Sequence, residues 1–182
     1  MRRGQIIGQV FVFIIAAVIF ILILTYGYKA FNTLRTRGDE VAFVDFVSKL
    51  KNEVKSISLS YGSTKKLELS GLPAKYKTIC FVTENDIKEN LLGTKASTDP
   101  RNLNAKYPMI YSLYEPNGEA NVFFMPGSPT PVKVDNIQAC DDPNGQACNA
   151  QWFCSSLDRG SVTLRLEGLG NGVRVSEWPT TP

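Results

Sequence analysis

An uncharged, strongly apolar run near the N-terminus constrains this chain more than any other feature. Residues 4–28 contain no Asp, Glu, Lys or Arg, and most of them are Val, Ile, Leu, Phe or Ala. As an α-helix this run would be about 37 Å long, enough to cross roughly 30 Å of bilayer hydrocarbon. Tyr26 and Tyr28 then supply the aromatic side chains that favour a membrane–water interface. The sequence therefore predicts a basic leader over residues 1–4 and a transmembrane helix over 5–28, with the lipid bilayer as its partner.

A cleaved secretory signal is the alternative interpretation of this run. Such a signal has an apolar core of about 7–15 residues, followed by small residues at the cleavage site. Here the apolar run is longer and is followed by Tyr28-Lys29-Ala30-Phe31, which offers no such site. The sequence favours a helix that stays in the protein as its anchor.

The helix is expected to continue beyond the membrane as an amphipathic segment over 29–57. Apolar residues recur there at steps of four and three, which places them on one helical face. These residues are Phe43, Val47, Leu50, Val54 and Ile57. We expect this face to pack on the chain's own domain, with packing against neighbouring subunits as the alternative. Gly38 is the position where we expect the helix to bend or break.

Residues 58–182 are predicted to form a β-rich domain. Alternating residues suggest a hairpin of strands 56–61 and 67–69. Further strands are expected at 78–82, 109–113, 121–125, 131–134, 150–154, 161–167 and 172–177. We expect a short helix over 86–92 and a loop over 94–107. The predicted fold class is α+β, with the long N-terminal helix packed on a small antiparallel sheet.

Composition argues against several classes of function. Histidine is absent, which removes the commonest general base and the commonest metal ligand. The net charge is only +3, from 20 basic and 17 acidic residues, so a nucleic-acid partner is not expected. The sequence therefore predicts a protein that is not an enzyme and that carries no cofactor and no metal.

The four cysteines, Cys80, Cys140, Cys148 and Cys154, indicate the compartment. An even count without zinc-site spacing is typical of disulfides in an exported domain, although four free thiols in a cytosolic domain are the alternative. Three pairings are possible. We favour Cys140 with Cys148, because a turn lies between them, and Cys80 with Cys154. In the chain-entropy model these bridges stabilise the domain by about 2.6 and roughly 4.4 kcal/mol.

The flanking charges of the apolar run are nearly balanced and do not decide its orientation. Arg2 and Arg3 precede it, and Lys29, Arg35 and Arg37 follow it. Disulfides would place the C-terminal domain outside the cell, which makes the N-terminus cytoplasmic.

The first nine residues carry a more specific signal. Arg2-Arg3-Gly4 is a basic leader that ends in glycine, and Gln5-Ile6-Ile7-Gly8-Gln9 follows it. This resembles the class III signal of archaeal type IV pilin-like proteins, in which Q-x-S-x-E follows the cleaved glycine. Gln5 matches the glutamine, whereas Gly8 stands in place of the serine and Gln9 in place of the glutamate.

The resemblance extends downstream and implies an architecture and a location. Segments 60–63, 79–82, 121–124 and 164–168 look like those of pilin-like membrane proteins of unknown function. The resemblance implies that a prepilin peptidase cuts between Gly4 and Gln5. It also implies that the helix packs in a filament. There Gln9 would take the place of a glutamate that pairs with a neighbour's amino terminus.

Two functions follow as expectations. The first is a pilin-like subunit or pseudopilin with a structural or adhesive role at the cell surface, assembled with copies of itself. The alternative is a monomeric, single-pass anchored domain that binds a ligand or a protein partner there.

Overall fold

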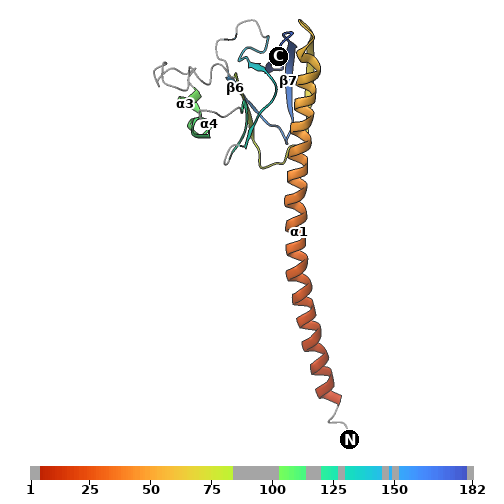
Figure 1. Ribbon diagram of the computed structural model, residues 1–182. Helices are drawn as coiled ribbons and strands as arrows, with labels where there is room; N and C mark the ends of the chain where they lie inside the picture. The colour runs from red at the N-terminus through yellow and green to blue at the C-terminus, as the bar shows by residue number, and fades with distance from the viewer. Residues whose placement is uncertain are drawn as a thin grey trace. The chain divides into compact units, whose positions relative to one another are not determined.

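The computed structural model describes residues 5–83, 103–113, 120–126, 130–144, 148 and 152–179 (Figure 1). Its elements are α1 (Gln5–Ser58), β1 (Thr64–Leu69), β2 (Thr78–Val82), α3 (Leu103–Lys106), α4 (Pro108–Leu113), β3 (Val122–Met125), β4 (Thr130–Val132), β5 (Ile137–Ala139), β6 (Trp152–Ser156), β7 (Val162–Gly168) and β8 (Val173–Glu177). The fold class is α+β, and the chain divides into two compact units, Met1–Val41 and Ala42–Pro182.

The first unit consists of the N-terminal part of helix α1. Its side chains are exposed from Val10 to Gly38, and the helix is long and apolar enough to cross a membrane. Helix α1 runs without a break from Gln5 to Ser58, so the predicted break at Gly38 is wrong. One glycine costs a helix about 1 kcal/mol relative to alanine, and strong helix formers such as Leu34 and Arg35 surround it.

In the second unit, the C-terminal part of α1 is a wall of the hydrophobic core. Phe46, Leu50, Val54 and Ile57 are buried, while Phe43 and Val47 are partly buried against them. The amphipathic face predicted from the sequence therefore packs on the chain's own domain, as expected. Because side chains three and four apart share one face of a helix, this packing fixes the rotation of residues 42–58 about the helix axis.

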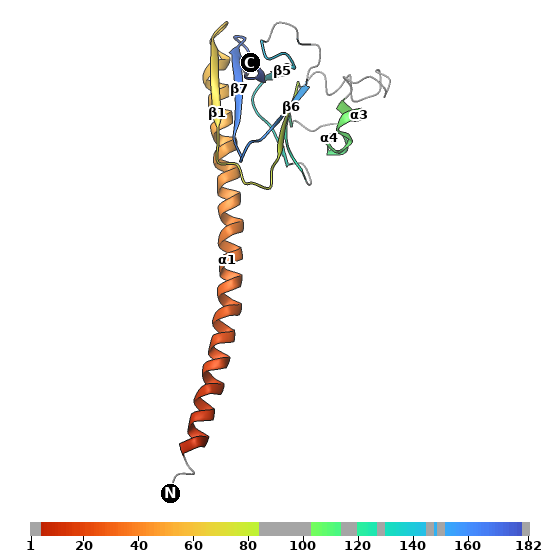
Figure 2. The ribbon, with the colours of Figure 1, turned by 180° about the vertical axis from the view of Figure 1, so that it is seen from behind.

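Two four-stranded sheets complete this core, where a single antiparallel sheet was predicted. The first has the order β1-β7-β8-β5 and the second β4-β3-β2-β6. Strand β5 pairs with β8 in parallel, from Ile137 opposite Val173 to Ala139 opposite Val175, so the first sheet is mixed. Strands β1 and β7 lie beside α1 in both views (Figures 1 and 2).

Aromatic rings connect α1 to the second sheet. The ring centroid of Phe43 lies 5.1 Å from that of Phe124 in β3 and 5.4 Å from that of Tyr76. Phe46 contacts Phe124 edge-on at 5.9 Å. Such pairs are worth about 0.5–1.5 kcal/mol beyond the area they bury. At the other sheet, Lys65 of β1 forms an ion pair with Glu53 of α1.

Several predicted strands are in place and three expectations are wrong. Strands β1–β4 and β6–β8 overlap the predicted ranges 67–69, 78–82, 121–125, 131–134, 150–154, 161–167 and 172–177. Residues 56–61 instead contain the end of helix α1 and the turn that follows it. The helix ends there because Ile57 is the last buried residue of its apolar face. Range 109–113 belongs to helix α4, and the predicted loop 94–107 contains helix α3. The predicted helix 86–92 lies outside the described residues.

We expect Leu50→Ala to reduce the free energy of unfolding by about 2–5 kcal/mol, because it opens a cavity between α1 and the sheets. The measurement is guanidinium unfolding of the full chain in detergent micelles, followed by tryptophan fluorescence. Val44→Ala, at an exposed position of the same helix, is the control and should change the value by about 0.5 kcal/mol or less. Equal losses for both variants would contradict the role given to this face.

Candidate functional site

Two disulfides join the four cysteines of the chain. Cys80 in β2 lies directly opposite Cys154 in β6, with 4.0 Å between their Cα atoms. Cys140 pairs with Cys148, eight residues further along. These are the same two pairs that the sequence favours. Because the strands β2 and β6 already pair through backbone hydrogen bonds, the first bridge reinforces an existing contact, whereas the second closes a loop.

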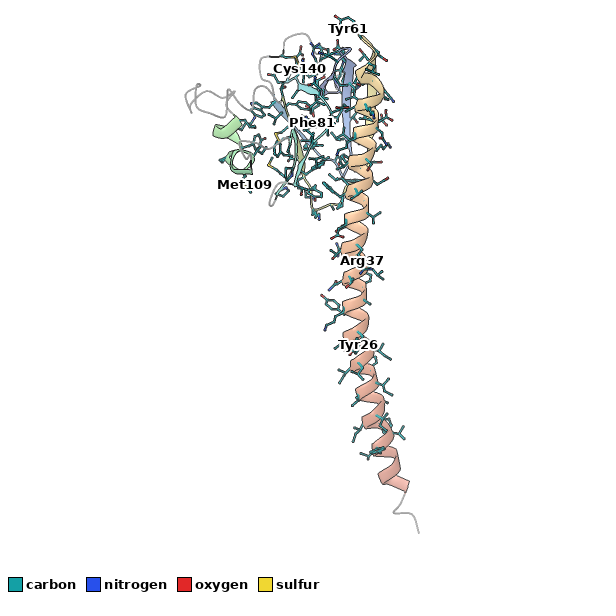
Figure 3. All side chains as sticks on the ribbon, in the orientation of Figure 1. Tyr26, Arg37, Tyr61, Phe81, Met109 and Cys140 are labelled. Carbon is teal, nitrogen blue, oxygen red and sulfur yellow. A yellow bond between two sulfur atoms is a disulfide. The ribbon has the colours of Figure 1, made fainter. Side chains whose placement is uncertain are left out.

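The segment that follows Cys140 contacts strand β7 through Pro143 and Asn144. Arg165 of β7 points outward and donates hydrogen bonds to the backbone carbonyls of Pro143, at 3.3 Å, and Asn144. Within the loop, the Asn144 N–H donates to an Asp142 carboxylate oxygen at 3.0 Å. The disulfide at Cys140 and the hydrogen bonds from Arg165 thus position Pro143 and Asn144 beside β7. Figure 3 shows Cys140 beside the sheets.

The two bridges differ in their access to solvent. Each bridge has one completely buried cysteine, Cys80 or Cys140, so the difference lies in the other sulfur: Cys148 is exposed, whereas Cys154 is half-buried. Cys80 lies among residues of α3, α4 and the second sheet. This second, smaller hydrophobic cluster contains Cys80, Val82, Leu103, Ile110, Phe123 and Trp152. Thiol–disulfide exchange requires the attacking thiolate to reach a sulfur atom, so burial slows it.

We expect a mild reductant to open Cys140–Cys148 faster than Cys80–Cys154, by on the order of tenfold in rate, because access limits the attack. Alkylation at successive times followed by peptide mass spectrometry measures both rates in the folded, full-length chain. The control is the same experiment in denaturant, where the two rates should converge. Faster opening of Cys80–Cys154 in the folded chain would contradict this burial.

The outward face of the first sheet carries a network of charges. Glu167 of β7 lies 3.3 Å from Arg174 and 3.9 Å from Arg165. On β1, the hydrogen bond and positive charge of Lys66 lower the pKa of the Glu68 carboxyl. Surface pairs of this kind contribute little to the free energy of folding, because water and salt screen them. The network keeps this face polar, and its Arg165 also contacts Pro143 and Asn144.

Among the described residues three polar ones are buried, and the contacts of two of them join parts of the fold. Asn121 bonds the backbone of Val134 in both directions, at 2.8 and 2.9 Å. Ser155 donates to Glu177 at 2.8 Å, which connects strand β6 to strand β8. Ser176 is the third. Among the described residues, no group of three acidic, cysteine or histidine side chains is placed to hold a metal ion.

The residues predicted to be processed or to assemble lie at the start of the chain. Gln5 is the first residue of helix α1, and Gln9 lies within its second turn. Gly4 lies outside the described residues. The proposed roles of these three residues remain predictions from the sequence.

Two exposed apolar surfaces outside the apolar run were not predicted from the sequence. The first lies on the part of α1 in the N-terminal unit and contains Phe31, Leu34 and Val41, with 64–69% of each residue exposed. The second is the turn between α1 and β1, where Leu59 and Tyr61 are 83% and 84% exposed. The spacing of Phe31, Leu34, Gly38 and Val41 is a helical pattern that was present in the sequence. The turn was not predicted because polar and apolar residues alternate over 56–61, as they do in a β-strand.

No protein-family model, curated protein or solved structure matches this chain.

Proposed function

We propose that this chain is a pilin-like structural subunit of the cell surface, anchored by residues 5–28 and assembled with copies of itself. The observation that carries the proposal is the division of one helix into two environments. The N-terminal part of α1 is apolar and uncovered, while its C-terminal part is buried in the core of the domain. In such a subunit, the helix carries a folded domain at one end, and its uncovered part can be surrounded by other helices.

The uncovered part of α1 needs an apolar environment. Large side chains such as Phe11, Phe13 and Phe20 are each more than 60% exposed. Exposing so many adjoining apolar groups to water is unfavourable at about 25 cal/mol per Å². Lipid provides that environment before assembly, and the helices of neighbouring copies provide it afterwards.

The disulfides support the orientation. Structural disulfides persist in oxidising compartments, so the domain that carries them faces outward. The basic leader, with Arg2 and Arg3, then stays on the cytoplasmic side. In this arrangement the leader is accessible to a peptidase that cuts between Gly4 and Gln5, as the resemblance implies.

We expect the mature protein from native membranes to begin at Gln5. Mass spectrometry of its N-terminal peptide measures this directly. A Gly4→Leu variant, which changes the residue before the cut, should retain Met1, whereas Gly8→Ala serves as the control and should still be processed. Retention of Met1 in the unaltered chain would count strongly against a pilin-like subunit.

Assembly is tested by shearing cells and sedimenting the released material. A filament subunit should appear in the high-speed pellet, and processing should precede its appearance. A chain that acts as a lone anchored receptor would stay with the membranes. Finding the full amount of protein in the membrane fraction, with none in the sheared pellet, would support that alternative.

A further inference from the structure

The turn between strands β7 and β8 contains an asparagine followed by a glycine. Strand β7 ends at Gly168, strand β8 begins at Val173, and Leu169-Gly170-Asn171-Gly172 joins them. Gly170 has a φ of +85°, and Asn171 does not share this left-handed backbone. A glycine with positive φ at the first central position is the pattern of a type II′ hairpin turn. Asn171 therefore occupies the second central position of a tight turn, where its side chain is exposed.

An asparagine can react with the backbone nitrogen of the residue that follows it. That nitrogen attacks Cγ of the side-chain amide and loses its proton, ammonia leaves, and a cyclic imide forms. Water then adds to either carbonyl carbon of the imide and opens it, which gives aspartate or isoaspartate. The net reaction exchanges ammonia for water, so it needs no enzyme and no oxidant. Glycine is the following residue that favours the attack most, because it has no side chain to obstruct the nitrogen.

The backbone nitrogen of Gly172 is available for this attack. The hydrogen bond across the turn runs from the Leu169 N–H to the Gly172 carbonyl, at 2.9 Å, and the structure records no acceptor for the Gly172 N–H among the residues it describes. Tight turns without the hydrogen bond from their fourth residue to their first are common. An N–H that is already bonded has to break that bond before its nitrogen can attack, and at Gly172 this cost is absent.

The side chain of Asn136 activates the same peptide group. Its Nδ2 donates a hydrogen bond to the Asn171 carbonyl oxygen at 2.9 Å. When the Gly172 nitrogen loses its proton, the negative charge is shared with that oxygen through the peptide group. A hydrogen bond to a charged acceptor is stronger than one to a neutral acceptor. The Asn136 amide therefore favours the deprotonated form, which is the form that attacks.

The fold requires glycine at position 172. A Cβ atom there would lie 2.6 Å from the Asn136 carbonyl oxygen and 3.2 Å from the Asn136 side chain. The Val173 N–H donates to the same carbonyl at 2.9 Å, where β5 begins to pair with β8. Asn136 thus connects the two strands and also excludes every larger residue after Asn171. The reactive pair is therefore a consequence of how these strands meet.

We infer that Asn171 is a site of spontaneous deamidation in the folded protein. This inference is independent of the proposed pilin-like function. A Cβ atom at Gly170 would lie 3.7 Å from the Tyr61 ring, so this turn adjoins the exposed turn between α1 and β1, where Figure 3 labels Tyr61. Residues 56–63 and 168–172 include no charged side chain. The reaction therefore places a carboxylate on two adjoining turns that are otherwise uncharged.

Peptide mass spectrometry of the full-length chain tests this inference. The protein is kept folded in detergent micelles in a mildly alkaline buffer and is digested with trypsin at successive times. Cleavage after Arg165 and Arg174 releases the peptide 166–174, in which Asn171 is the sole asparagine or glutamine. We expect its mass to rise by the difference between an amide and an acid. Fragmentation should show both aspartate and isoaspartate, because direct hydrolysis of the side chain would give aspartate alone.

A synthetic peptide of residues 166–174 supplies the rate for an unfolded chain. The folded protein should react within about a hundredfold of this rate, because opening of an exposed turn needs far less free energy than global unfolding. A reaction that required global unfolding would be slower than the peptide by at least about a thousandfold. A rate more than about a hundredfold below that of the peptide would overturn the inference, because the turn would then protect Asn171.

Asn136 and one variant serve as controls. Asn136 is exposed like Asn171, but Ile137 follows it, and its branched side chain obstructs the attacking nitrogen. Asn136 should stay unmodified over the same period. In Asn171→Gln the longer side chain has to close a larger ring, so the peptide 166–174 should keep its mass. Equal modification of Asn136, or of the Asn171→Gln variant, would also overturn the inference, because the reaction would then not depend on this turn.

Discussion

The burial of one face of helix α1 against both sheets is the contact on which the rest of this structure depends. Leu50 and Val54 share a single core with Leu164 of the first sheet and with Ile79 and Phe124 of the second. Without the helix, neither sheet would have a full cover for its inner face. Residues 42–58 of α1 are therefore an integral part of the domain.

The disulfides and buried polar groups do not form this core; they stabilise the segments around it. The Cys80–Cys154 bridge links strands that are already paired, and the Cys140–Cys148 bridge constrains a loop that Arg165 also holds. Asn121 uses both ends of its amide to fix the chain after β4. These features fix the segments that connect strands. Burial of apolar side chains alone would leave several arrangements of those segments with similar energy.

Much of this architecture could be predicted because its signals are periodic and local. The apolar run and the helical face from Phe43 to Ile57 are long patterns, and strands such as β2 and β7 are bounded by turn residues. The elements that were not predicted are short, or they depend on contacts between residues far apart in the chain. Strand β5 has three residues, and its parallel pairing with β8 depends on residues 36 positions away. The exposure of Leu59 and Tyr61 depends on backbone contacts with Gly168, which no local pattern reveals.

The buried stripe of α1 also couples rotation to translation within the domain. In a helix each residue turns the chain by about 100° and advances it by 1.5 Å. Inserting one residue between Phe46 and Leu50 would turn Leu50, Val54 and Ile57 by more than a quarter turn relative to Phe46, so the two groups could not face the sheets together. Inserting seven would nearly restore their shared direction but shift them by about 10 Å along the helix. The number of residues in this segment thus decides whether the helix can contact both sheets.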